Sequence, residues 1–168
     1  HKGCDMRKYL TVPTMALLAP LTAAQAWAQP IMAEQKFVTA TGARALVDSC
    51  LAYAKKNNLR VGVAVVDISG NLLDYHTMEG TDLIAGESAT LKAKTAVRWQ
   101  QPTDDLNRRV KNKDNIAPAL IGDFPQEGGV PIFMDGVIVG GMGIGGGRGD
   151  ACAKAAIAPA ATARMRAG

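Results

Sequence analysis

A glycine-rich stretch near the C-terminal end of the chain carries residue types that can bind an anion. Gly145, Gly146 and Gly147 stand directly before Arg148, and a predicted helix follows them. Free backbone N–H groups at the start of a helix attract negative charge, and an arginine beside them adds a positive one. The same pattern fits a tight strand-to-helix turn that uses glycine only for its backbone dihedral angles. A ligand cradle and a plain turn therefore both stay open.

His76 is the one histidine of residues 29–168. An imidazole can exchange protons near neutral pH and can bind a metal, including the iron of haem. The alternative is a histidine that is only hydrogen-bonded where a strand meets a helix. Asp74, Glu79 and Lys92 are the groups available for acid–base work on a small organic acid or aldehyde. An enzymatic role is therefore an open alternative to ligand binding, and the residues do not decide whether the chain is an enzyme.

Several well-known kinds of site are missing from the sequence. There is no G-x-S-x-G motif of a serine hydrolase and no phosphate-binding P-loop. Zinc sites need several histidine or cysteine ligands, and residues 29–168 offer only His76, Cys50 and Cys152. The run GIGGG is similar to a dinucleotide loop, but it follows a predicted hairpin rather than a strand of a βαβ unit. These observations argue against those four classes.

Residues 1–28 are predicted to be a secretory signal peptide preceded by a few upstream residues. Arg7 and Lys8 give a positive start, a mostly apolar run follows, and Ala26-Trp27-Ala28 is a small-x-small cleavage site. The apolar run is broken by two prolines and is too short to span a membrane. We therefore expect a periplasmic or secreted protein whose mature part, residues 29–168, is a single domain without a membrane span.

Charge and cysteine content set further limits on partners. The whole sequence has a formal net charge of +4, and residues 29–168 alone carry 16 basic and 14 acidic side chains. No lysine and arginine cluster with interleaved aromatic residues is present, so nucleic acid is not an expected partner. Cys50 and Cys152 would meet an oxidising compartment after export. They fall on predicted helices that share one face of the sheet, and both a disulfide and two buried free thiols stay open.

Hydrophobic periodicity predicts where helices and strands lie. Strand 61–68 is apolar on both of its faces, which is typical of a strand covered by helices on both sides. Asp135-Gly136 predicts a type I′ hairpin turn. Residues 116–124 are ambiguous, with a short strand as one interpretation. The expected helices run over 40–57, capped by Thr39, over 87–100, and to about Lys111 from a cap at Thr103. Strands are expected over 72–78, 130–134 and 137–144, and a last helix over 151–164 that Asp150 caps and Pro159 kinks or ends.

Hairpins pair their strands in antiparallel fashion, and strands apolar on both faces need helices on both sides. We therefore expect an α/β fold, a profilin-like three-layer α/β/α sandwich around an antiparallel sheet of about five strands. The first and last helices would share one face, and the middle pair would cover the other. Alanine-rich helix faces also suit pairing between subunits, so we expect a homo-oligomer.

Five sequence blocks form a recognisable set. They are Val63–Leu73 (VAVVDISGNLL), Met78-Glu79-Gly80, the pattern A-x-x-K-A-x-T-A from Ala89 to Ala96, Gly128–Ile144, and Asp150–Ala155. Together they resemble the GlcG/HbpS family, the haem-binding or haem-degrading domain that also occurs as the C-terminal domain of PduO-type proteins. The resemblance implies an α/β sandwich that forms homo-oligomers and binds haem or a related small molecule.

The resemblance favours His76 as a ligand of haem iron. Thr77 stands where an arginine often precedes the Met-acidic-Gly turn, and the loop before Asp150 is short and rich in glycine. We expect a pocket between the strand of His76 and the glycine loop, floored by residues 137–144. The ligand-binding residues expected there are His76, Glu79, Lys92, Gly143, Gly145, Gly146, Gly147 and Arg148.

Three classes of function stay open. The chain could be an exported binding protein for haem or another small ligand, an enzyme on a small organic acid or aldehyde, or an accessory subunit of an oxidation pathway. The glycines of strand 137–144 also have a competing explanation, which is that they let a helix or a neighbouring subunit pack closely.

Overall fold

The computed structural model describes residues 34–147 and 149–164. Arg148 and the predicted signal peptide lie outside the described residues. The elements along the chain are α1 (Ala40–Lys56), β1 (Gly62–Asp67), β2 (Leu72–Thr77), α2 (Leu83–Trp99), α3 (Thr103–Lys111), α4 (Ala117–Leu120), β3 (Gly129–Met134), β4 (Val137–Gly145) and α5 (Gly149–Arg164).

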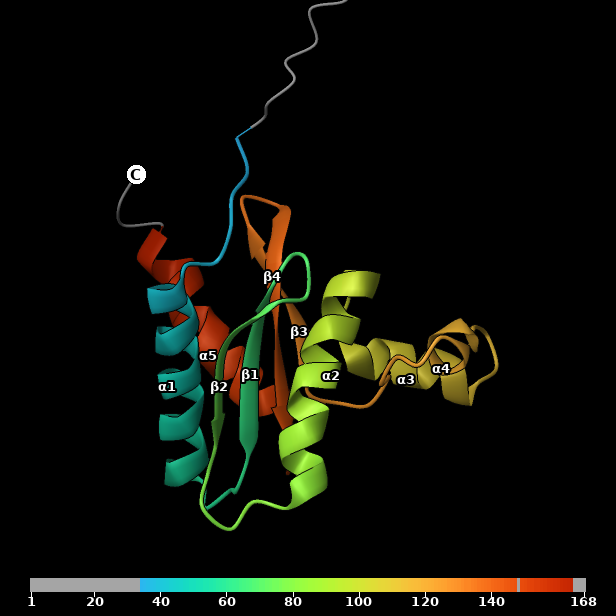
Figure 1. Ribbon diagram of the computed structural model, residues 1–168, viewed down its shortest axis with the longest axis horizontal. Helices are drawn as coiled ribbons and strands as arrows, with labels where there is room; N and C mark the ends of the chain where they lie inside the picture. The colour runs from blue at the N-terminus through green and yellow to red at the C-terminus, as the bar shows by residue number, and fades with distance from the viewer. Residues whose placement is uncertain (1–33, 148, 165–168) are drawn as a thin grey trace, which may run out of the picture. The chain divides into compact units, whose positions relative to one another are not determined.

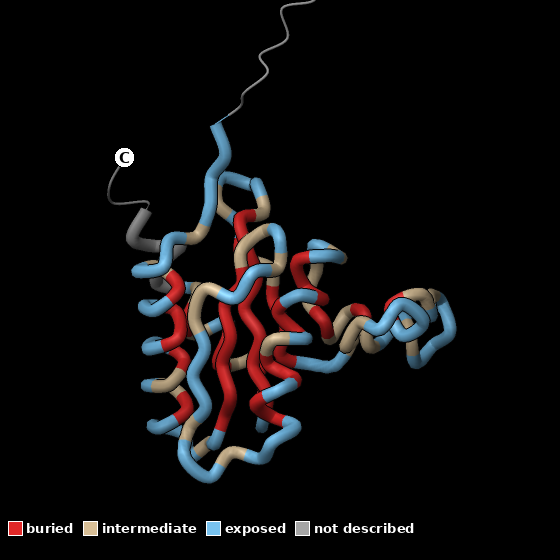
Figure 2. Tube along the Cα trace, in the orientation of Figure 1, coloured by how far each residue is buried: buried red, intermediate tan, exposed pale blue. Residues whose placement is uncertain are grey.

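Two hairpins join to form one antiparallel sheet. The strand order is β2-β1-β4-β3, so β1 and β4 lie in the centre and β2 and β3 are the edges. Asp135 and Gly136, with φ angles of 53° and 75°, form the predicted type I′ turn between β3 and β4. The two hairpins meet where β1 pairs with β4, and Val63 lies opposite Ile144 there. Figure 2 shows that these two central strands are buried along nearly their whole length.

Helices cover both faces of the sheet (Figure 1). The side chains of Val63, Val65, Met142 and Ile144 pack with those of α1 and α5 into the main hydrophobic core. On the other face, Val66 packs against α2 in a smaller cluster. The predicted α/β sandwich, with the first and last helices on one face, is therefore confirmed.

Some details differ from the expectation. The sheet has four strands among the described residues, because residues 117–120 form the short helix α4. Pro118 suits the first turn of a helix, where its missing N–H is not needed. Helix α2 starts four residues earlier than expected, at Leu83, and α5 includes Asp150 in its first turn and continues through Pro159. Thr39 caps α1 as predicted, accepting a hydrogen bond from the Gly42 N–H at 3.0 Å.

A disulfide joins α1 to α5. Cys50 and Cys152 are bonded, with their Cα atoms 5.1 Å apart, and both residues are fully buried. The sequence left this bridge and a pair of free thiols as alternatives, and the bridge is the one that forms. No helix in the described part of the chain is both long and apolar enough to cross a bilayer.

Candidate functional site

Helix α2 fills the space above the glycines of β4. A Cβ added to Gly143 would lie 2.0 Å from the Ala89 carbonyl oxygen, and one added to Gly145 would lie 1.7 Å from that of Ala85. Contacts this short are not possible, so the glycines let the helix backbone lie directly on the sheet. Of the two explanations that the sequence left open for these glycines, close packing of a helix is the one that the structure shows. The room that was expected above Gly143 and Gly145 for a ligand is therefore occupied by the protein itself.

The two glycines that follow β4 differ in the space around them. Gly146 has a φ of +94°, and a Cβ there would lie 2.4 Å from the Arg60 carbonyl oxygen. Gly147 is exposed, and the nearest atom to an added Cβ is 4.0 Å away. Gly146 thus fits the plain turn, whereas Gly147 keeps free space at the start of α5. An anion site at Gly147 and Arg148 stays a prediction.

Lys92 is buried on the face of α2 that meets the sheet. Its Nζ donates a hydrogen bond to the Ile144 carbonyl oxygen at 3.1 Å and lies 5.8 Å from the centroid of the Phe124 ring. Burial lowers the pKa of Lys92, and the negative charge of Glu127 partly offsets this. The ammonium group ties α2 to the end of β4, so a structural contact accounts for its position.

His76 lies exposed on the edge strand β2, opposite Val63 of β1. The structure gives it no hydrogen bond or ion pair within the described residues. Two positions along the same strand, the Asp74 carboxylate forms an ion pair with Arg44, whose Nε lies 2.8 Å from it. Glu79 is exposed in the turn that follows β2. The imidazole is therefore accessible to a ligand from solvent, with a cation on the same side of the strand.

The sheet separates His76 from the other predicted ligand residues. Residues directly opposite each other in antiparallel strands share a face, so His76, Val63 and Ile144 point to the side of α1 and α5. Gly143 and Lys92 belong to the side of α2. The structure thus brings Lys92 close to the end of β4, but it does not bring His76 into one pocket with Lys92 and the glycines.

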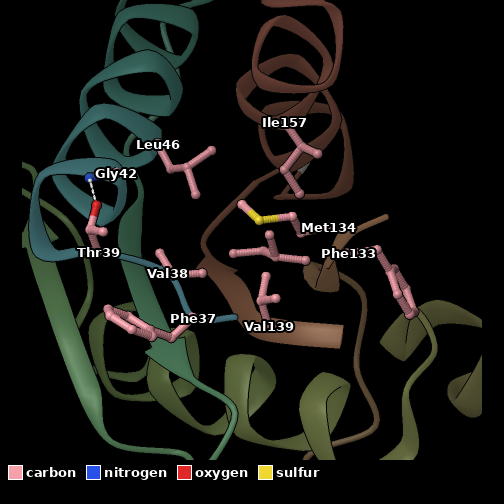
Figure 3. A pocket seen from close by; sticks show the side chains of 10 residues that line it. Phe37, Val38, Thr39, Gly42, Leu46, Phe133, Met134, Val139 and Ile157 are labelled. Carbon is pink, nitrogen blue, oxygen red and sulfur yellow. Dashed lines mark hydrogen bonds between the residues drawn. The ribbon is translucent and has the colours of Figure 1, made fainter. Parts of the chain in front are cut away.

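A cavity lies elsewhere, between the start of α1, the β3–β4 hairpin and α5 (Figure 3). Its volume is about 240 Å³. In Figure 3 the side chains of Leu46, Met134 and Ile157 point towards one another across it. We call it the apolar pocket, and its lining residues are Phe37, Val38, Thr39, Gly42, Leu46, Ile132, Phe133, Met134, Val139 and Ile157.

The sequence did not predict this pocket. Its residues come from three segments far apart in the chain, and each of them is an ordinary core or turn residue by type. The one signal available was Phe37-Val38, an apolar pair placed directly before a capped helix. A second hollow of about 540 Å³ runs along the edge strand β3 and shares Phe133 and Ile157 with the apolar pocket. The described residues contain no group of three or more histidine, cysteine or acidic side chains that could hold a metal ion.

Comparisons with known proteins match this fold and sequence. Residues 38–161 match the family model described as haem degrading protein HbpS-like. Protein GlcG of Escherichia coli is 35% identical over 105 residues, which is 61% of this chain and 76% of GlcG.

Two crystal structures are similar over most of this chain. HbpS is 31% identical, with a TM-score of 0.69 over 80% of this chain and 95% of that one. The PduOC:haem complex is 27% identical, with a TM-score of 0.65 over 68% of this chain and 88% of that one. Since the family model spans most of the domain described above, and the sheet and helix layers agree with those of its relatives, the chain belongs to the HbpS-like family.

Proposed function

We propose that this protein is an exported small-ligand binding protein that binds haem, with His76 as the ligand of the iron. The observation that carries the proposal is the accessible imidazole on β2, which has no partner among the described residues. A neutral imidazole nitrogen that is not hydrogen-bonded can bind iron directly. The solved relative PduOC, which was crystallised with haem, supports the choice of ligand.

The residues around His76 fit haem at the metal and at one charge. Haem needs an axial ligand, apolar cover for its ring and partners for its propionates. His76 offers the first, and Arg44, which is paired with Asp74, offers a cation on the same side of the sheet. Neither the apolar pocket nor the hollow along β3 includes His76. Haem held by His76 would therefore have no cover from either hollow. It would supply iron for redox chemistry, and His76 would supply a nitrogen ligand to that iron.

Titration with haemin tests the proposal. The wild-type protein is expected to give a defined Soret band, and His76→Ala is expected to shift or abolish it. Lys94→Ala, which changes an exposed side chain on α2, is the matched control and should behave like the wild type. If His76→Ala leaves the Soret band and the affinity for haemin unchanged, His76 is not the ligand. A small carboxylate near Gly147 and Arg148 then becomes the better proposal.

A role as an enzyme or accessory subunit acting on a small organic acid or aldehyde is the second candidate. The lowered pKa of Lys92 favours it, because a lower pKa raises the fraction of neutral amine, the form that attacks a carbonyl group. Reduction with borohydride in the presence of glycolaldehyde would attach the aldehyde to Lys92, and peptide mass spectrometry would detect the added mass. An unmodified Lys92 would leave ligand binding as the function.

Export is supported by the disulfide between Cys50 and Cys152, because such bonds persist in oxidising compartments. N-terminal sequencing of the protein from the periplasm should find Gln29 as the first residue, and a chain that still begins at Met6 would contradict export.

A homo-oligomer is supported by the apolar side chains that α2 exposes, Leu83, Ile84 and Leu91. Light scattering would contradict it by finding a monomer at micromolar concentration.

A further inference from the structure

We propose that the apolar pocket is a second binding site, separate from His76, for a small neutral apolar molecule such as a single aromatic ring or a short alkyl chain. It lies at the end of the sheet where the β3–β4 hairpin turns, with Ile132 and Val139 in its wall. His76 lies on the opposite edge strand, in register with Ile144 at the far end of β4. The two sites therefore share no residue.

The residues that line the apolar pocket disfavour a charged ligand. None of the lining residues has a charged side chain, and Thr39 has the one side-chain oxygen or nitrogen among them. That oxygen already accepts the hydrogen bond from the Gly42 N–H. The nearby charges of Lys36 and Asp135 are paired with each other. A charged ligand would thus lose its hydration without gaining a partner, while a hydrocarbon would lose nothing.

The volume sets the size of the ligand. An apolar cavity of roughly 150 Å³ is large enough to stay dry and bind benzene. The pocket has about 240 Å³, which admits one substituted ring. Sites for drug-sized molecules usually have about 300–1,000 Å³. The pocket is therefore suited to a molecule much smaller than haem.

The walls are held in place before any ligand arrives. Leu46 of α1 lies one helical turn before Cys50, and Ile157 of α5 lies five residues after Cys152. The disulfide between these cysteines fixes the two helices that carry the opposing walls. A preformed site loses less conformational entropy on binding, so reduction of the disulfide is expected to weaken the site.

Methionine methyl NMR with toluene tests the proposal in the intact protein. Met134 lines the pocket, whereas Met78 and Met142 do not. Toluene should shift the Met134 methyl signal in a saturable way and leave the Met78 and Met142 signals in place. Benzoate, which has the same ring and a negative charge, should shift Met134 only at much higher concentration. Failure of toluene to shift Met134 in the folded protein would overturn the proposal.

Filling the pocket gives the decisive variant. Gly42→Leu adds four carbons at the pocket wall. Its Cβ would lie 3.2 Å from the Thr39 hydroxyl oxygen, a contact that a small shift relieves, and the variant should weaken toluene binding by at least about tenfold. Ala45→Leu adds the same side chain at an exposed position of α1 and should bind toluene like the wild type. Ile157→Phe fills the pocket from α5 and serves if Gly42→Leu folds poorly. Unchanged toluene binding in a folded filling variant would place the ligand elsewhere.

The haemin and toluene experiments are independent. His76→Ala should leave the toluene shift of Met134 unchanged, and Gly42→Leu should leave the Soret band unchanged. A failure of haem binding at His76 would therefore not remove the pocket. Loss of the toluene shift in His76→Ala would contradict the separation of the two sites.

Discussion

Lys92 shows how a single residue can have the right type for chemistry and a different use in the fold. The sequence places Lys92 on a predicted helix and offers it either as a positive charge at an anion site or as an acid–base group. The structure directs its ammonium to the Ile144 carbonyl oxygen at the end of β4. The chemical roles open to Lys92 could therefore be inferred from the sequence. The direction of its side chain could not, because it depends on a strand more than 40 positions away.

The lowered pKa of Lys92 predicts a pH dependence of stability. The folded chain holds the proton of Lys92 less tightly than the unfolded chain, where the pKa has its ordinary value of 10.5. The free energy of unfolding should therefore rise with pH between the lowered folded pKa and 10.5, and stay flat below both values. Lys92→Met should remove this rise, since methionine does not titrate.

Urea unfolding over a series of alkaline pH values would measure this dependence. Lys94→Met, which changes an exposed lysine of the same helix, should keep the rise seen in the wild type. Parallel pH profiles for the wild type and Lys92→Met would show that the burial of the ammonium group does not matter to stability.

His76 marks the limit of what residue types can tell. The sequence predicts correctly that it lies on the second strand, with Asp74 on the same side. It does not say that β2 is an edge strand or that the sheet divides His76 from Lys92. Both facts depend on the pairing of β1 with β4, which joins segments about 75 residues apart, and no local pattern encodes that pairing.

At the scale of elements, the backbone of α2 lies directly on β4. Gly141, Gly143 and Gly145 occur at every second position, so all three face the helix. The sequence indicated a close approach at these glycines but left open whether a ligand, a helix or a subunit makes it. The sequence did not show which of these packs on the glycines, because α3, α4 and β3 separate α2 from β4 along the chain.

Gly143→Ala is expected to destabilise the protein strongly. The new methyl group would overlap the Ala89 carbonyl oxygen, so α2 must move away from the sheet. Overpacking of this kind costs at least about 1–3 kcal/mol. Gly147→Ala, which has free space, should change stability by less than roughly 0.5 kcal/mol. Denaturant unfolding of both variants is the measurement, and a stable Gly143→Ala protein would mean that the helix can withdraw without cost.

Local chemistry predicted most elements and missed those fixed by tertiary contacts. The Thr39 cap and the Asp135-Gly136 turn depend on neighbouring residues alone, and both are confirmed. Thr103 was expected to cap α3, but it is the first residue of that helix. Its hydroxyl instead accepts from the Gly129 N–H at 2.8 Å and donates to the Gln126 carbonyl oxygen. That contact to the strand β3 decided its position.

At the scale of the whole molecule, the disulfide closes the layer formed by α1 and α5. It joins residues 102 positions apart. In the chain-entropy model a loop of about 100 residues adds roughly 4–5 kcal/mol to the free energy of unfolding. The Cys50→Ala, Cys152→Ala double variant should lose most of this stability in denaturant unfolding. Two free thiols in the denatured, unreduced wild type would contradict the bond.

The layers of the molecule were predictable because hairpin signals and two-sided apolar strands constrain them. The apolar pocket was not, because it forms where α1, α5 and the β3–β4 hairpin fail to fill the space between them. Such a gap depends on side-chain volumes in three segments at once, and it leaves no repeated pattern in the sequence. The family resemblance did not predict the apolar pocket either, because it pointed to His76 and the glycine loop.

The antiparallel arrangement of α1 and α5 has one more consequence. Cys50 meets Cys152, and Leu46 shares a pocket with Ile157, so the start of α1 lies near the C-terminal part of α5 (Figure 1). The start of α1 and the C-terminal part of α5 therefore lie close together, and the packing of the domain does not require the chain to begin at α1. A circular permutant that links the old ends and opens the chain between Asn112 and Lys113, beside the protruding α3 and α4, should still fold and form the disulfide.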